Sequence, residues 1–351
     1  MDTKTIRTIK LGIVILIGLT IVLGLGYILI SWNQPLSDPL DLTGGTQGNI
    51  VESPVESTDE QDTPMITSTP TLEPVCGGPL TMNILVSGVA SNSFLYGLAD
   101  AIRIVRVDFQ RQKITVLAFP RDLWVEIPGL EEQSITAGKL NQAYFYGTEG
   151  MGYYDGAGYG SGLLAETLLH NYGFWTDHYL AVNLNSFRKI IDTIGGIDVY
   201  LAYDVYQKEF EEPKLFLKAG SHHLNGFQAE MLARHRITIG DFGRINNQTV
   251  ILKAMAVKML TPTGLAAVPA LVNQLISNVI TDLSPGEITQ LICLAGMIDY
   301  NEDIHFATLS DELLSEERVF DPTRGTYTAA LIGDDEMIRS LMTAFQRGEW
   351  P

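Results

Sequence analysis

Residues 11–30 are twenty consecutive positions without a charged side chain, and they are rich in Ile, Leu and Val. A helix of that length covers the hydrocarbon core of a bilayer. Lys4, Arg7 and Lys10 precede the run, and Trp32 followed by acidic residues comes after it. Because the positively charged flank of a membrane span stays in the cytoplasm, the pattern predicts a cytoplasmic tail over residues 1–10 and a transmembrane helix over residues 11–31. The rest of the chain is then expected outside the cytoplasmic membrane.

A cleaved signal peptide and a buried core helix are the alternatives to a permanent anchor. Signal peptides have a shorter apolar stretch, which ends in a small-x-small cleavage site. The flank here reads SWNQPLSDPL and contains no such site. The sequence therefore favours a single-pass protein of the cell membrane.

Residues 32–78 differ sharply in composition from what surrounds them. They are rich in Pro, Ser, Thr, Gly, Asp and Glu, as in ESPVESTDEQDTP and STPTLEP. Such a segment cannot bury enough apolar surface to fold by itself. We therefore expect a disordered acidic stalk that holds the following domain away from the membrane.

Charge and cysteine content exclude several classes of function. The formal net charge of −18 argues against nucleic-acid binding, which normally needs a basic surface. Cys76 and Cys293 are too few for a thiolate metal site. Outside the cytoplasm the two could form a disulfide, but the sequence leaves open whether they meet.

Strand and helix patterns alternate between residues 79 and 310. Residues 101–109 and 113–119 read as two strands of a hairpin, residues 178–183 as another strand, and residues 163–172 and 187–194 as helices. The order predicts one α/β domain with a mixed central sheet between layers of helices. A capping box at Ser284 to Glu287 begins a later helix. Residues 311–351 form a C-terminal extension without recognisable chemistry.

The segment HHLNGFQAEMLARHRITIGDFGRINNQ holds the candidate binding residues. Arg234 and Arg236 are two apart, so an extended backbone would place them on one face. Asp241 suits the N-cap of a helix in which Arg244 and Gln248 share a side. Arginines near a helix N-terminus favour phosphate, and the apolar continuation of that helix could accept a lipid tail. Ordinary surface ion pairs are the alternative.

The same segment resembles the signature of the LytR–CpsA–Psr family, also described as the cell envelope-related transcriptional attenuator domain. In that family a helix ending in R-x-R is followed by D-F-G-R and a glutamine. Four further pieces resemble family blocks in the same order: ADAIRIVRVD, PRDLWVEIPG, KLNQAYFYG and IIDTIGGIDVYL. The resemblance covers about residues 83–260, and the helix and strand up to residue 309 also fit.

The resemblance implies a phosphotransferase that moves a glycan from a polyprenyl-pyrophosphate carrier onto peptidoglycan or another cell-wall acceptor. It places Asp100 as a ligand of Mg²⁺ or Mn²⁺. The catalytic candidates are Arg121, Arg236 and Asp241. The pyrophosphate-binding candidates are Arg121, Lys139, Arg234, Arg236, Arg244 and Gln248. Asp241 is a candidate for orienting an arginine or accepting a proton, although a helix cap is its simpler role.

One expected metal ligand is missing. Members of the family carry an acidic residue after the first strand in a G-[VS]-D pattern, whereas this chain has Gly88, Val89 and Ala90. The loss predicts weakened metal binding, because alanine offers no oxygen ligand. It leaves two alternatives open beside the active transferase. These are a catalytically weak protein that binds the carrier lipid or glycan, and a polyprenyl pyrophosphatase that needs no acceptor.

Overall fold

The computed structural model describes residues 31–42, 73–209, 212–237 and 240–350. The predicted cytoplasmic tail and all but the last residue of the predicted transmembrane helix therefore lie outside the described residues. Within the described ranges, no single helix has both the length and the hydropathy of a membrane span. Helix α6 (Gly240–Met259) and the Pro262–Leu271 part of α7 (Pro262–Asn278) reach that threshold only as a pair, across a bend of 83°.

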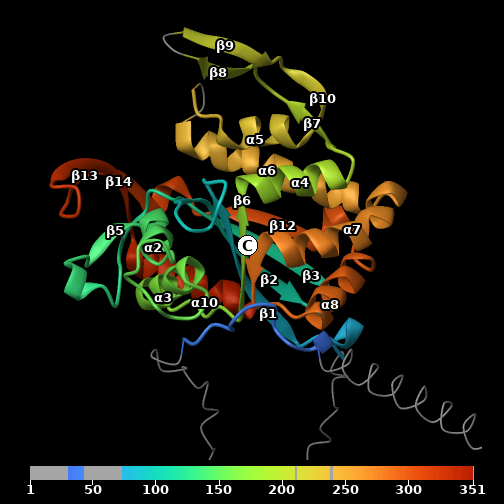
Figure 1. The fold of residues 1–351 in the computed structure, drawn as a ribbon, viewed down its shortest axis with the longest axis horizontal. Helices are drawn as coiled ribbons and strands as arrows, with labels where there is room; N and C mark the ends of the chain where they lie inside the picture. Colours follow the sequence, from blue (N-terminus) through green and yellow to red (C-terminus); the bar gives the residue numbers. More distant parts are fainter. Residues whose placement is uncertain (1–30, 43–72, 210–211, 238–239, 351) are drawn as a thin grey trace, which may run out of the picture.

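A six-stranded mixed sheet forms the centre of the domain, in the order β11-β6-β1-β2-β3-β12 (Figure 1). Its strands are β1 (Thr81–Val89), β2 (Ala99–Asp108), β3 (Lys113–Phe119), β6 (His178–Asn183), β11 (Val279–Thr281) and β12 (Ile304–Thr308). The β1–β2, β2–β3 and β11–β6 pairs are antiparallel, and the β1–β6 and β3–β12 pairs are parallel. The structure thus confirms the predicted hairpin and the mixed central sheet flanked by helices.

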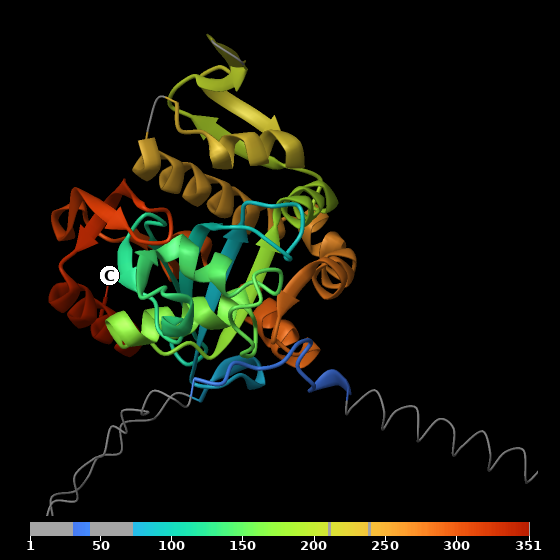
Figure 2. The same ribbon diagram turned by 60° about the vertical axis from the view of Figure 1, so that its left-hand side comes forward.

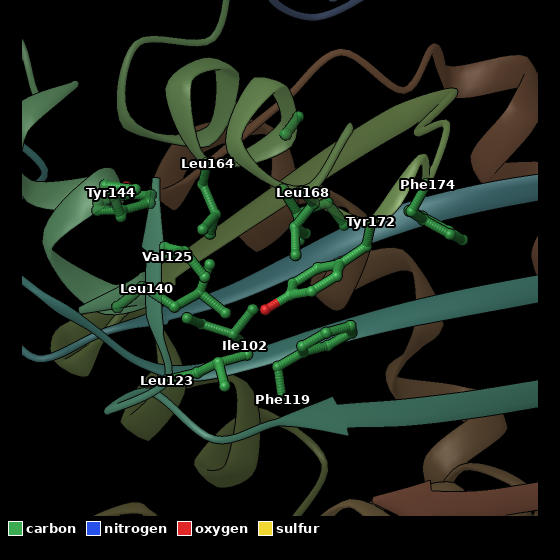
Figure 3. Packing of buried hydrophobic residues seen from close by; sticks show 14 of the residues in the cluster. Ile102, Phe119, Leu123, Val125, Leu140, Tyr144, Leu164, Leu168, Tyr172 and Phe174 are labelled. Atoms are coloured by element: carbon green, nitrogen blue, oxygen red, sulfur yellow. The ribbon is translucent and has the colours of Figure 1, made fainter. Parts of the chain in front are cut away.

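One face of the sheet is covered by three helices and a short hairpin (Figures 1 and 2). These elements are α2 (Leu140–Tyr146), α3 (Gly160–Tyr172), α10 (Asp335–Arg347), β4 (Trp124–Glu126) and β5 (Ala137–Lys139). Figure 3 shows Tyr172 and Leu168 of α3 lying over Ile102 and Phe119 of the sheet. Their burial removes large apolar surfaces from water, which makes this layer the main core of the domain.

The opposite face is covered by α8 at one end and by a helical lobe at the other (Figure 1). The helices of this side are α4 (Leu184–Thr193), α5 (Gly226–Arg234), α6 (Gly240–Met259), α7 (Pro262–Asn278), α8 (Pro285–Ala295) and α9 (Tyr300–Asp303). The lobe also contains strands β7 (Ile197–Leu201), β8 (Val205–Glu209), β9 (Glu212–Leu217) and β10 (Gly220–Leu224). The predicted capping box is present at the start of α8, where Ser284 and Glu287 cap each other.

The stalk prediction is wrong for the described parts of residues 32–78. Leu42 is only 4% exposed and belongs to the main core, and Leu40 packs beside it. The backbone carbonyl of Asp38 accepts a hydrogen bond of 3.1 Å from the Tyr179 hydroxyl. Residues 75–77 form a short 3-10 helix against α8. The leucines of this polar segment pack against apolar residues that are distant in sequence, and composition alone does not predict such contacts.

Residues 311–351 are an integral part of the fold and not an appended extension. They form β13 (Leu314–Asp321), β14 (Thr326–Gly333) and α10, preceded by a 3-10 turn. Ile338, Met342 and Phe345 of α10 are fully buried in the main core. The spacing of these three residues puts them on one helix face, so α10 contributes directly to the packing of the main core.

Cys76 and Cys293 form a disulfide that joins the short helix before β1 to α8. The bond closes a loop of 217 residues in sequence separation. Closing so long a loop restricts the unfolded chain strongly, so we expect Cys293→Ala to lower the free energy of unfolding by about 2–4 kcal/mol. Urea unfolding of both proteins measures the difference. Wild-type protein treated with reductant serves as the matched control, and the two must agree if the bond itself is responsible.

A histidine between two carboxylates lies where β6 begins. His178 Nδ1 is 3.5 Å from Asp282 Oδ1, and Nε2 is 3.4 Å from Glu287 Oε1. Burial alone would lower the pKa of His178, but Asp282 and Glu287 raise it to about 10. Burial alone would raise the pKa of Glu287, but His178 and Ser284 lower it to about 2. The two shifts stabilise the charged pair in the folded state.

Stability should therefore depend on pH through His178. A histidine with a raised folded pKa contributes fully below its unfolded pKa of about 6.5, and the contribution fades as pH approaches 10. We expect the free energy of unfolding to fall between pH 6 and pH 9 by more in the wild type than in His178→Gln. Urea titrations at both pH values measure this. Equal losses in the two proteins would show that the pair does not control the pH dependence.

Candidate functional site

Arg121 is at the centre of a charged cluster beyond the end of β3. It lies in the turn after Pro120, and its guanidinium reaches three carboxylates. Nη1 donates to Asp100 Oδ1 at 2.6 Å, and Nε is 3.3 Å from Asp122 Oδ2 and 3.4 Å from Asp241 Oδ1. Asp100 belongs to β2, so the cluster joins the sheet to the turn and to α6. One planar guanidinium with several acceptors is held in a defined orientation.

Lys139 joins the cluster through Asp122. Its Nζ lies 2.7 Å from Asp122 Oδ1, and Lys139 immediately precedes α2. The antiparallel β4–β5 pair places Lys139 opposite Trp124, two residues beyond Asp122. A hydrogen bond of 3.1 Å from the Asn141 amide to the Arg121 carbonyl ties the same turn to α2. Both cations are therefore set by backbone contacts as well as by charge.

Helix α6 supplies the third side of the cluster. Arg244 Nη2 lies 2.9 Å from Asp241 Oδ2, and Nη1 lies 3.8 Å from Asp100 Oδ2. Arg236, just before the helix, is 3.6 Å from Asp100 Oδ2 and 3.9 Å from Asp241 Oδ1. The N-cap prediction for Asp241 is wrong, because α6 begins at Gly240 and Asp241 lies in its first turn. Its carboxylate orients three arginines instead.

Gln248 and Arg234 lie differently from the rest. Gln248 Nε2 is 3.5 Å from the Asp100 carbonyl, on the same side of α6 as Arg244. Arg234 is the last residue of α5, and its Nη1 donates to Glu230 Oε1 at 3.0 Å. The expected extended segment from Arg234 to Arg236 is wrong, because the helix continues through Arg234. The two arginines therefore have different partners, although Arg234 still lines the adjacent cavity.

The electrostatics of the cluster follow from its burial. Burial lowers the pKa of Arg244 to about 10, against the opposing effect of Asp241. Burial alone would also lower the pKa of Arg121, but Asp100, Asp122 and Asp241 raise it above its ordinary value. Burial alone would raise the pKa of Asp122, but Lys139 and Arg121 lower it. These pKa shifts keep Arg121, Asp122 and Arg244 charged at neutral pH. The cluster contains one more cationic side chain than carboxylates.

A cavity of about 320 Å³ opens beside the cluster. It lies between the sheet and helices α4, α5 and α6. Its polar end includes Asp100, Arg244 and Gln248, and the rest of its wall is mainly apolar. The apolar wall is formed by Val86, Leu180, Val182, Leu184, Phe187, Ile190, Ile251, Leu252 and Met255. This arrangement suits an amphiphile with an anionic head and a hydrocarbon chain.

The donor set limits what kind of metal could bind here. Ala90 lines the cavity and offers no side-chain oxygen, and both oxygens of Asp100 face guanidinium groups. Across the described part of the chain, no group of three or more His, Cys, Asp or Glu could hold a metal ion. The residues do not fit an ion held by protein alone. They fit an ion that takes most of its ligands from water or from the oxygens of a bound ligand.

Sequence reasoning missed Arg103, which also lines the cavity. It is 3% exposed, and burial lowers its pKa to about 10. Its position was visible in the pattern AIRIVRVD, where two arginines interrupt a strand of buried apolar residues. A buried arginine in a central strand is unusual enough to single out.

Comparisons with known proteins concern the sequence and the fold of the chain. A sequence model of the LytR_cpsA_psr family matches residues 54–329. The polyisoprenyl-teichoic acid–peptidoglycan teichoic acid transferase TagV of Bacillus subtilis is 30% identical over 191 residues, which are 53% of this chain and 45% of that protein. The enzyme TagU of Halalkalibacterium halodurans, with the same descriptive name, is 28% identical over 57% of this chain and 60% of its own length. The matches thus span about half of each curated relative.

The fold is also similar to solved structures. The crystal structure of B. subtilis TagV aligns with a TM-score of 0.58 and 24% identity, covering 77% of this chain and 98% of that one. A structure described as TagT bound to LIIa-WTA aligns with a TM-score of 0.54 and 17% identity, covering 76% of this chain and 90% of that one. At these identities the likeness concerns the fold alone.

Proposed function

The chain belongs to the LytR_cpsA_psr family, and from that premise we propose that it is a phosphotransferase of the glycopolymer–peptidoglycan ligase type. Its donor would be a glycan on a polyprenyl-pyrophosphate carrier, and its acceptor a cell-wall hydroxyl, most simply on peptidoglycan. The observation that carries the proposal is the cavity whose polar end, which includes Arg244 and Gln248, continues into an apolar chamber.

The charged cluster would hold the pyrophosphate. Arg121, Arg236, Arg244 and Lys139 outnumber the three carboxylates around them. An entering phosphate can accept hydrogen bonds from the same N–H groups that now face Asp100 and Asp241. Phosphate and carboxylate are both oxyanions with similar hydrogen-bond geometry. Gln248 and Arg234 also line the cavity and would contact the head group.

In the proposed reaction, the acceptor hydroxyl oxygen attacks the sugar-linked phosphorus. A new P–O bond forms to the acceptor, and the bond from that phosphorus to the bridging oxygen breaks. Polyprenyl monophosphate leaves with the electron pair, and the hydroxyl proton is released, with Asp241 as its candidate acceptor. Arg121 and Arg244 stabilise the charge that develops on the bridging oxygen, since preorganised donors act most strongly where water is excluded.

We propose Asp100 as the protein ligand of Mg²⁺ or Mn²⁺. When bound together with the substrate's phosphates, the ion would neutralise their charge. Asp241 retains a role without the ion, because it holds the guanidinium groups of Arg121 and Arg244 in place.

We also propose that the domain lies outside the cytoplasmic membrane, anchored by residues 11–31. The Cys76–Cys293 disulfide supports this location, because such bonds persist in oxidising compartments. The carrier lipid would reach the cavity from the same membrane, and nucleic acid is not expected as a partner because the chain is strongly acidic.

Turnover with point variants tests the proposal. The full chain is incubated with a polyprenyl-pyrophosphate-linked sugar, an acceptor and Mg²⁺ or Mn²⁺. We expect Arg236→Ala to lower turnover about 10- to 100-fold, because a charge-assisted contact to phosphate is removed. Asp100→Ala should remove the metal-dependent part. Turnover unchanged in both variants would contradict the assigned site.

Ala90 favours one other function, a binding protein with weak or no catalysis. The absence of that carboxylate reduces the protein's hold on a metal ion. Such a protein would bind the carrier through Arg236 without turnover. A polyprenyl pyrophosphatase would instead hydrolyse the carrier without any acceptor. It would release orthophosphate from free polyprenyl pyrophosphate and a sugar phosphate from the glycan-linked carrier.

A further inference from the structure

Arg103 differs from every arginine of the charged cluster in its partners. Its Nη2 donates to the Ile245 carbonyl and to Thr249 Oγ1, both at 3.1 Å. Its Nη1 is buried and has no hydrogen-bond partner among the described residues, and no carboxylate there forms an ion pair with it. The guanidinium therefore carries a charge that the described protein does not neutralise. Burying an uncompensated charge is costly unless a ligand supplies the opposite charge.

The position of Arg103 places that charge inside the cavity. Its strand partner is Val86, and both line the cavity wall formed by the sheet. Its two acceptors on α6 are the residues that directly follow Arg244 and Gln248. Arg103 therefore lies alongside the polar end of the cavity, where the apolar wall begins. Arg244 also has buried Nε and Nη1 groups without a hydrogen bond among the described residues.

We infer that Arg103 is a binding residue for the phosphate attached to the hydrocarbon chain of the carrier. The inference rests on the proposed function and adds the Arg103 guanidinium to the residues that bind this phosphate. Nη1 of Arg103 and the free N–H groups of Arg244 would donate to its oxygens, while the chain enters the apolar part of the cavity. With Arg103 included, the cations exceed the carboxylates by two, which suits a pyrophosphate diester better than the outer cluster alone does.

Arg106 provides a matched control on the same strand. It is also buried, at 7% exposure, but it has a carboxylate partner. Nη1 donates to Asp108 Oδ2 at 3.0 Å, and Nε donates to the Gln346 carbonyl at 3.1 Å. It does not line the cavity. Replacing Arg106 removes a structural ion pair, whereas replacing Arg103 removes a charge that awaits a partner.

The experiment uses the full chain in lipid nanodiscs, with geranylgeranyl phosphate and geranylgeraniol as probes. We expect Arg103→Met to weaken binding of the phosphate about 10- to 100-fold, because a charged hydrogen bond is lost. Binding of the alcohol should not change, and the Tm without ligand should stay the same or rise. Arg106→Met should lower the Tm and leave both affinities unchanged.

Each result decides something. If Arg103→Met binds the phosphate as well as the wild type, or if its Tm falls as far as that of Arg106→Met, Arg103 is structural and the inference is overturned. If the wild type does not prefer the phosphate to the alcohol, the proposed function fails as well. Arg103→Lys separates charge from shape, and we expect an intermediate affinity because lysine keeps the charge without the planar fork.

Discussion

Arg121→Ala is expected to lower turnover by about 10²- to 10³-fold, the largest loss among single substitutions in the cluster. Arg121 is the one cation that touches Asp100, Asp122 and Asp241 together. Its removal takes away a donor to the developing charge and leaves three carboxylates facing the same space. Steady-state release of polyprenyl monophosphate measures the effect.

Two further variants serve as controls for Arg121→Ala. Arg121→Lys keeps the charge but cannot reach several oxygens at once, so we expect it to recover only part of the activity. Arg318→Ala removes an arginine of β13 outside the cluster and should behave as wild type. If Arg121→Ala retained most of its activity, the reaction would not take place at this cluster.

The second large effect concerns stability. Phe345 of α10 is fully buried, and its ring lies 5.9 Å from that of Phe174 and 6.4 Å from that of Trp350. Phe345→Ala should therefore lower the free energy of unfolding by about 3–5 kcal/mol, through lost burial and a residual cavity. Urea unfolding followed by tryptophan fluorescence measures it.

Met337 is the matched control on the same helix. It is half exposed, so Met337→Ala should change the free energy of unfolding by no more than about 0.5 kcal/mol. A similar small change in Phe345→Ala would show that residues 335–347 are not part of the cooperative fold. A large difference between the two variants would confirm that the C-terminal segment and the sheet unfold together.

Local patterns predicted the sheet and several helices because those elements follow simple periodicities. Strands β6 and β7 alternate buried and less buried residues, and α8 begins at a capping box that the sequence shows directly. The charged cluster was predicted as a set of residues from the resemblance to a family. The ion pairs within the cluster were not predicted, because the partners of Arg121 come from three separate elements.

The features that the sequence did not predict have physical explanations. Leu40 and Leu42 lie in a segment of polar composition, and only the tertiary structure shows the apolar surface that receives them. No helix was predicted over Ile338, Met342 and Phe345, although their spacing fits one helix face. That spacing also does not show which surface the helix covers. Arg103 interrupts an apolar strand, and its environment depends on α6, which is 142 residues away in sequence.

The most direct test of the proposed transfer is to identify where the phosphorus goes. The full chain is given a carrier whose sugar-linked phosphate is isotopically labelled, with and without a peptidoglycan acceptor. The account predicts label on the acceptor and unlabelled polyprenyl monophosphate, both only when the acceptor is present. Labelled sugar phosphate and polyprenyl monophosphate released without an acceptor would indicate a pyrophosphatase, and bound carrier without any product would indicate a binding protein. Either result would contradict the proposed transfer.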